Sequence, residues 1–147
     1  MEPSLIEIGE TAHALRRAFD RRAATLGVTR AQWRVLVRLS RDPGLRQVDL
    51  ADFLDIEPIT LCRIVDRLEE SELVERRRDP TDRRAWRLEL TAKAAPVVEK
   101  LRSLATDFSA DAFAGLSPAE LDTMRTALAL VRDNLAALQP PKKASIA

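Results

Sequence analysis

Apolar residues recur at steps of three and four along most of the chain, which predicts a mainly α-helical protein. The longest stripes lie near the two ends. Residues 5–26 form one, which stops near Gly27, where we expect the first helix to end. A Ser117–Glu120 capping box with proline at the first helical position opens the last helix, and its stripe runs over residues 121–138. Another helix is expected between Thr91 and the last helix, with Thr91 as its cap and Val97, Leu101, Leu104 and Phe108 on one side. Pro96 is expected to kink this helix or delay its regular start.

Three shorter helices are predicted between these ends. Thr29 and Gln32 form a capping box, with Trp33, Leu36 and Leu39 facing inward behind it. Asp42-Pro43-Gly44 is a turn, and a short helix with Val48, Leu50, Ala51 and Leu54 on its inner face follows. A further helix begins at Glu57-Pro58 and buries Leu61, Ile64, Val65 and Leu68.

Two strands joined by a basic loop follow this fourth helix. Trp86, Leu88 and Leu90 alternate with Arg87 and Glu89, as in a strand with one wet face. The loop before it runs Asp79-Pro80-Thr81-Asp82 and then carries two arginines. The order helix, strand, basic loop and strand is typical of a winged helix-turn-helix. The expected fold class is therefore mainly α with a small β-wing, in which a winged helix-turn-helix module sits on a helical dimerisation frame.

The outward face of the fourth helix carries residue types that contact bases. With its apolar side inward, Ile59, Arg63, Asp66 and Glu70 point outward and Thr60 lies on a flank. A guanidinium can donate two hydrogen bonds to guanine, and aliphatic groups can contact a thymine methyl. The bland alternative is a solvated helix face with ordinary charges. Arginines at the wing tip favour DNA binding, since a narrow minor groove attracts inserted guanidinium groups.

Composition adds little beyond where the charges cluster. The net charge of the 147 residues is only +1, but six arginines crowd residues 76–87 and four crowd residues 16–22. The high share of arginine among the basic residues can also reflect a GC-rich genome. No run is apolar and long enough for a membrane span, and the acidic N-terminus is unlike a signal peptide. We therefore expect a cytoplasmic protein without a membrane partner.

The segment IEPITLCRIVDRLEESELVERRRDPTDRRAWRLELT resembles the signature region of the multiple-antibiotic-resistance regulator (MarR) family, and the likeness continues upstream through LGVTRAQWRVLVRLSRDPGLRQVDLADFLD. It covers about residues 26–100. It implies a homodimeric transcription regulator, expected to act as a repressor on double-stranded DNA with a pseudo-palindromic operator. The implied DNA-binding residues are Arg46, Gln47, Pro58, Ile59, Thr60, Arg63, Arg67, Arg83 and Arg84, with Asp82 and Arg84 as the pair that stabilises the wing.

The resemblance also sets expected boundaries. Residues 1–140 form one domain, with the DNA-binding module at about 29–92, the dimerisation region at 1–28 and 93–138, and a flexible tail at 139–147. Packing of the long stripes against the chain's own core is the alternative to pairing with a second copy. Two departures from the family pattern concern stability. Glu72 replaces a glycine after the recognition helix, and Arg46 replaces a Ser or Thr helix cap and can instead face a phosphate.

The remaining candidates for chemistry are few. Family members often bind phenols or aromatic carboxylates, so His13, Arg17 and Trp33 are candidate effector ligands, although a surface histidine is the simpler interpretation. Cys62 is the single cysteine and is better explained as small filler than as a redox sensor. No metal-ligand cluster, phosphate loop or nucleophile motif is present, so no cofactor, metal or enzymatic activity is expected. A winged helix that binds proteins rather than DNA is the rival class.

Overall fold

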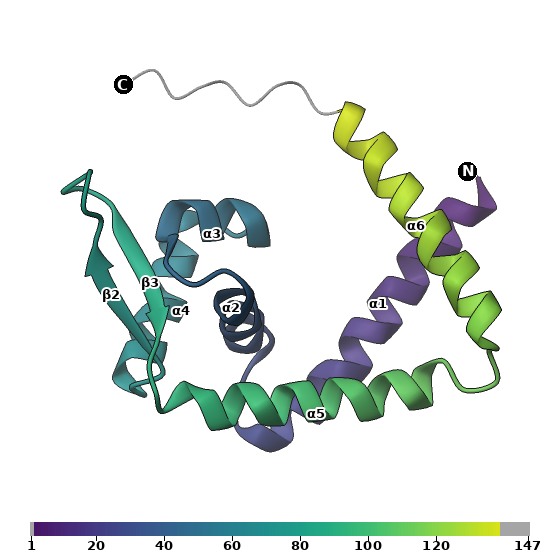
Figure 1. Ribbon diagram of the computed structural model, residues 1–147, viewed down its shortest axis with the longest axis horizontal. Coiled ribbons are helices and arrows are strands. Elements are labelled where there is room, and N and C mark those ends of the chain that lie inside the picture. The colour runs from purple at the N-terminus through teal and green to yellow at the C-terminus, as the bar shows by residue number, and fades with distance from the viewer. Residues whose placement is uncertain (1, 139–147) are drawn as a thin grey trace. The chain divides into compact units, whose positions relative to one another are not determined.

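The computed structural model describes residues 2–138 and divides the chain into two compact units (Figure 1). The first holds five α-helices, a 3-10 turn and a small sheet, and the second holds one long helix. The flexible tail expected at residues 139–147 lies outside the described residues.

Every predicted helix is present, with these bounds: α1 Pro3–Ala23, α2 Arg30–Arg41, α3 Gln47–Leu54, α4 Pro58–Glu70, α5 Ala94–Ala112 and α6 Pro118–Leu138. A 3-10 turn, Ala24–Leu26, follows α1 and ends at Gly27, whose φ of 74° is left-handed. Both predicted capping boxes are confirmed. Thr29 and Gln32 exchange hydrogen bonds of 3.2 and 3.0 Å at the start of α2, and Ser117 and Glu120 do so before α6.

The sheet has three strands rather than the expected two. β2, Val74–Arg78, and β3, Trp86–Leu90, form the predicted antiparallel wing. A two-residue strand, β1, Leu45–Arg46, pairs with the other edge of β3, which gives the order β1-β3-β2. Gly44 precedes β1 with a φ of 74°, and a Cβ there would lie 2.9 Å from the Glu89 carboxylate. The positive φ favours glycine here, whereas the flexible Glu89 side chain could move aside for a Cβ.

The core of the first unit lies where α2, α3 and α4 pack together with the sheet and the start of α5. Its largest fully buried side chains are Val35, Leu36, Leu39, Leu50, Leu61, Val65, Leu68, Leu88 and Leu101. Burial of these groups supplies the main driving force for folding this unit. It also fixes which face of α4 turns outward.

Some predicted inward positions are wrong. Val48 is 62% exposed on α3, so that helix buries Leu50, Ala51 and Leu54 alone. Trp86 is exposed on β3, where Arg78 covers its ring. Helix α5 buries Leu101 as expected, with Val97, Leu104 and Phe108 partly buried, and it also buries Ala94 and Val98, which the predicted stripe did not include.

The junction between β3 and α5 also differs from the prediction. Thr91 does not cap α5 with its side chain, because its hydroxyl donates to the Glu72 carbonyl oxygen at 2.5 Å. Helix α5 begins three residues later at Ala94, so Pro96 lies in its first turn, where a missing N–H is tolerated.

Candidate nucleic-acid interface

The N-terminal half of α4 presents the predicted base-contacting side chains to solvent. Pro58 occupies the first turn, where its fixed φ suits a helix start. Ile59 is 63% exposed, and Thr60 and Arg63 are exposed beside it. Leu61, Val65 and Leu68 are buried on the opposite side and hold this face outward. The helix therefore offers a methyl-bearing and a guanidinium-bearing surface at the end that its dipole makes favourable for anions.

The C-terminal half of α4 is instead fastened to the wing by Arg76. This β2 side chain forms ion pairs with Asp66 and Glu69 of α4, and its Nε donates to the Gln47 amide oxygen of α3 at 3.0 Å. Its Nη2 also donates to the Cys62 carbonyl oxygen at 3.2 Å. Burial alone would lower the pKa of Arg76, but its interactions with the Asp66 and Glu69 carboxylates outweigh burial and raise that pKa. Asp66 and Glu69 thus join α4 to the wing, and Gln47, expected at DNA, is hydrogen-bonded within the protein.

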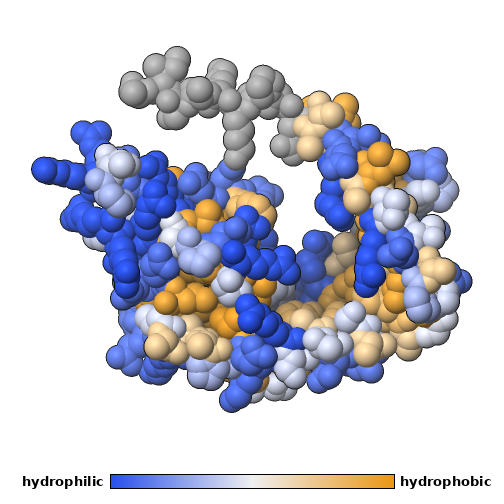
Figure 2. Space-filling model, viewed as in Figure 1, coloured by the Kyte–Doolittle hydropathy of each residue, from blue (hydrophilic) through white to orange (hydrophobic). Residues whose placement is uncertain are grey.

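The wing loop, residues 79–85, exposes both predicted arginines. Neither Arg83 nor Arg84 forms an ion pair among residues 2–138. The Arg83 carbonyl oxygen accepts a hydrogen bond of 2.7 Å from Arg78, whose guanidinium lies 4.6 Å from the centre of the Trp86 ring. The two tip arginines are thus held at their main chain while their side chains stay free. Figure 2 shows hydrophilic residues gathered over this end of β2 and β3.

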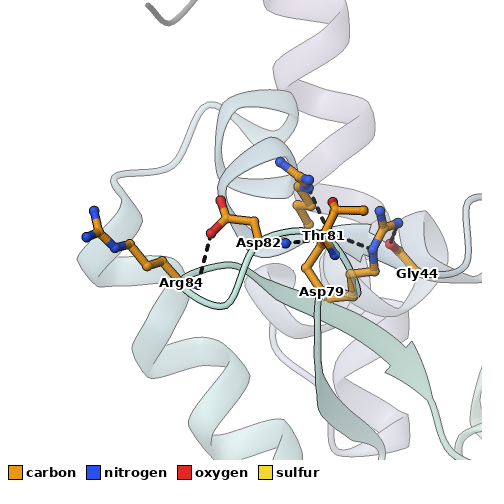
Figure 3. Close-up of polar contacts among 7 residues, drawn as sticks. Gly44, Asp79, Thr81, Asp82 and Arg84 are labelled. Carbon is orange, nitrogen blue, oxygen red and sulfur yellow. Dashed lines mark hydrogen bonds and ion pairs between the residues drawn. The ribbon is translucent and has the colours of Figure 1, made fainter. Parts of the chain in front are cut away.

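The expected pairing of Asp82 with the Arg84 guanidinium is absent from the described part of the chain. The Asp82 carboxylate instead accepts the main-chain N–H of Arg84 at 2.9 Å, which is a local turn contact (Figure 3). Asp82 therefore stabilises the backbone of the wing loop rather than the Arg84 side chain.

The carboxylate that holds the wing is Asp79, which the sequence did not single out. It is buried, and its Oδ2 accepts from Arg46 Nε at 2.9 Å and from Arg87 Nε at 2.8 Å. Its Oδ1 accepts from the main-chain N–H and the hydroxyl of Thr81 at 2.9 and 2.8 Å (Figure 3). Thr81, followed by Arg46, holds the pKa of the Asp79 carboxyl well below its usual range. The only sequence signal for this role is its place at the end of a strand before proline.

The arginines of the sheet, α4 and the wing loop differ in whether an acidic side chain pairs with them. Four arginines have acidic partners. Arg76 pairs with Asp66 and Glu69, and Arg77 pairs with Glu75. Arg46 and Arg87 both pair with Asp79. Within residues 2–138, four predicted DNA-binding arginines have no acidic partner, and these are Arg63, Arg67, Arg83 and Arg84. These four cations lie on the outward face of α4 and at the wing tip, although other exposed arginines, such as Arg17 and Arg41, also have no ion pair within residues 2–138.

Comparison with known proteins agrees with this geometry. The MarR family model matches residues 28–86. A solved structure of the transcriptional regulator PA3341 is 32% identical over 90% of this chain and 97% of that one, with a TM-score of 0.81. The chain belongs to the MarR family. A MarR regulator from Methanosarcina mazei Go1 shares the fold over 95% of this chain and all of its own, with a TM-score of 0.85 and 23% identity.

One MarR-family structure of the same shape holds DNA. It is a putative regulator from Listeria monocytogenes complexed with a 26mer DNA, 26% identical over 93% of this chain and 91% of that one, with a TM-score of 0.81. The match with that structure covers most of the present chain, whose three-stranded sheet and helices present α4 and the wing.

The predicted effector ligands of this MarR chain lie on α1 and α2. His13 and Arg17 are exposed on α1. Trp33 of α2 is half-buried against the same helix, with its N–H donated to Asp20 at 2.9 Å and its ring edge-on to Phe19. A cavity of about 450 Å³ lies between the end of α2, the end of β3 and α5, and none of the three lines it.

Two absences concern the described residues only. No group of three or more histidine, cysteine or acidic side chains among them could hold a metal ion. None of their helices is long and apolar enough to cross a membrane.

Proposed function

We propose that this protein is a sequence-specific DNA-binding regulator that acts as a homodimeric repressor. The observation that carries the proposal is the distribution of unpaired guanidinium groups described above. Two, Arg63 and Arg67, lie on an exposed face of α4, and two, Arg83 and Arg84, lie at the wing tip. Exposed arginines without an ion pair also occur elsewhere within residues 2–138, as Arg41 does, but these four lie on the helix and the wing that a winged helix presents to DNA, and a polyanion-binding surface needs its cations free.

Each element has a separate role in this proposal. The first turn of α4 enters the major groove, where Arg63 donates to guanine and Ile59 or Thr60 contacts a thymine methyl. The wing tip places Arg83 in the adjacent minor groove, and Arg84 contacts the backbone. Arg46 and Gln47, at the start of α3, lie beside the wing.

A twofold dimer would present two such surfaces to a pseudo-palindromic operator. The half-sites would then lie about one helical turn, roughly 10–10.5 bp, apart or at a multiple of that spacing. Dimerisation is supported by the apolar residues that α6 leaves exposed, which include Val131 and Leu135. We expect the dimer to act in the cytoplasm, where it meets its DNA.

Release by a small phenol or aromatic carboxylate is the regulatory part of the proposal. It rests on the family resemblance, with His13 and Arg17 on α1 and Trp33 packed against the same helix as candidate ligands. Adding benzoate or phenol to a preformed DNA complex tests it directly. Release of DNA would support the proposal if the same benzoate or phenol concentration does not lower the protein's unfolding midpoint. Retention of DNA would contradict regulation by these compounds.

Selection of bound sequences from a random duplex pool tests the central claim. We expect an inverted repeat to be enriched, and the affinity for it to fall steeply between low and moderate salt. Recovery of no preferred sequence, with equal weak binding to all duplexes, would contradict a sequence-specific regulator. Failure to bind any duplex at low salt would favour a winged helix that binds proteins.

A further inference from the structure

The Asp79 cluster contains more positive charge than its carboxylate needs. Arg46 and Arg87 both bind the same oxygen, Oδ2, while the other oxygen is occupied by Thr81 and by the Asp82 N–H at 3.2 Å. Two guanidinium charges against one carboxylate leave a net charge of +1 on the cluster. Thr81 and one arginine would already satisfy the carboxylate, so the second arginine needs another explanation.

The sheet register brings the two arginines together. Arg46 of β1 is the direct partner of Arg87 of β3, so their side chains leave the same face of the sheet. Their Nε atoms lie 2.9 and 2.8 Å from one oxygen and so cannot be farther apart than the sum of those distances. Arg87 is further fixed by donating from Nη1 to the Gly44 carbonyl oxygen at 3.0 Å (Figure 3).

Donors remain free on both groups. Arg46 uses only its Nε within residues 2–138, which leaves both terminal nitrogens, and Arg87 retains Nη2. The Arg46 side chain is 35% exposed and that of Arg87 41%, whereas the Asp79 side chain is fully buried. The carboxylate is thus hidden beneath two solvent-facing guanidinium edges, an arrangement that suits a tetrahedral anion with several acceptor oxygens.

We propose that Arg46 and Arg87, oriented by Asp79, form a binding site for one phosphate of the DNA backbone in each half-site. This inference rests on the proposed function and names a contact that is separate from base contacts of α4 and from the wing tip. Asp79 is a positioning residue in it, because it does not touch the phosphate. The site also ties the start of α3 to the wing, so a phosphate bound there would fix the wing relative to the recognition helix.

The test compares neutralised arginines with neutralised phosphates. Duplexes from the selection experiment are prepared with single methylphosphonate linkages, each of which removes the charge of one phosphate. Wild-type protein should bind more weakly when the contacted phosphate is neutralised. The Arg46→Gln/Arg87→Gln double variant should show no further loss at that one position and ordinary losses at the others. Its salt slope should fall by about one unit, as for one lost phosphate contact.

Controls separate this role from wing stability. Arg102→Gln removes the same charge from an exposed α5 side chain and should leave the slope and the methylphosphonate pattern unchanged. If the double variant does not fold, Arg87→Gln alone serves, because the amide can still donate to Asp79 without carrying a charge. Equal losses for variant and wild type at every neutralised phosphate would overturn the site. Absence of wild-type binding to any duplex would instead overturn the proposed function.

For Asp79→Asn, a positioning role and a purely electrostatic role predict opposite changes in DNA affinity. The substitution adds one unit of positive charge to the protein, so a purely electrostatic effect would tighten DNA binding. We expect weaker binding and a lost response to the specific methylphosphonate, because the two guanidinium groups lose the anion that orients them. Tighter binding with an unchanged pattern would show that Asp79 does not position them.

Discussion

Arg63 is the exposed cation one turn into α4, and no acidic side chain among residues 2–138 engages it. Arg63→Ala should therefore cost about 1–3 kcal/mol at the operator and relax base preference at one position in each half-site. Parallel binding selections on wild type and variant measure both effects. Arg63→Lys is the matched control, since it keeps the charge but loses the two-donor fork. An unchanged motif with uniformly weaker binding would place Arg63 on a phosphate.

Glu72, which follows the Ser71 C-cap of α4, has a φ of 58°, a conformation that favours glycine. The sequence suggested this strain from the family pattern, and the backbone confirms it. Glu72→Gly should raise the melting temperature by roughly 2–6 °C relative to Glu72→Ala, because both variants lose the Lys93 ion pair but only glycine relieves the backbone. Thermal unfolding of the two variants side by side provides the measurement. Equal melting temperatures would mean that the turn relaxes without cost.

At the scale of elements, the wing combines a free tip with a fixed base. Arg83→Ala should weaken binding to most duplexes and flatten the salt slope by about one unit, because a cation at the tip is lost without a structural contact. The Arg83 contact that the structure shows is through its carbonyl oxygen, which the variant keeps. Salt titrations of DNA binding measure the slope. An unchanged slope and affinity would exclude the tip from the interface.

Asp82→Ala provides the contrasting wing variant. It removes the carboxylate that holds the Arg84 N–H, so it should weaken binding by disordering the loop rather than by removing a positive charge. The salt slope should change less than for Arg83→Ala, while protease cleavage within residues 79–85 should become faster. An unchanged cleavage rate would mean that the loop is held without Asp82.

Elements with a local signal were predicted from the sequence, and elements held by distant contacts were not. The starts of α2 and α6 are set by capping boxes within four residues, and both were predicted correctly. Strand β1 is two residues long and exists because it pairs with β3 some forty positions later, so no local periodicity marks it. The burial of Val48 was also predicted wrongly, because apolar identity alone does not reveal which face a short helix buries.

The candidate site followed the same division. The outward residues of α4 could be predicted from helical geometry once its apolar face was known, and the structure exposes Ile59, Thr60 and Arg63 as expected. The Asp79 cluster could not be, because it joins Arg46 and Arg87 across two strand pairings. Sequence reasoning therefore chose the neighbouring Asp82, which has the right residue type but contacts only the loop backbone.

At the scale of the whole molecule, α6 has no buried residue within its own chain. Leu135→Asp should therefore leave the fold of one chain intact but dissociate a dimer, since an unpaired carboxylate is costly in an apolar interface. Light scattering should give about twice the 16.5 kDa chain mass for wild type and once for the variant. Asn134→Asp is the matched control at the adjacent exposed position. A monomeric wild type at micromolar concentration would contradict the dimer.

The two tryptophans differ in exposure, so their intrinsic fluorescence can report on DNA binding by the wing. Trp33 is half-buried, with its N–H bonded to Asp20, whereas Trp86 is exposed on the wing beneath the Arg78 guanidinium. In a Trp33→Phe variant all indole emission would come from the wing. Iodide, an anion drawn to the surrounding arginines, should quench that emission more strongly than neutral acrylamide does, and bound DNA should suppress the iodide effect first. If bound DNA reduces quenching by iodide and by acrylamide equally, Trp86 is simply buried in the complex. Fluorescence quenching can therefore show whether the wing contacts the DNA phosphates.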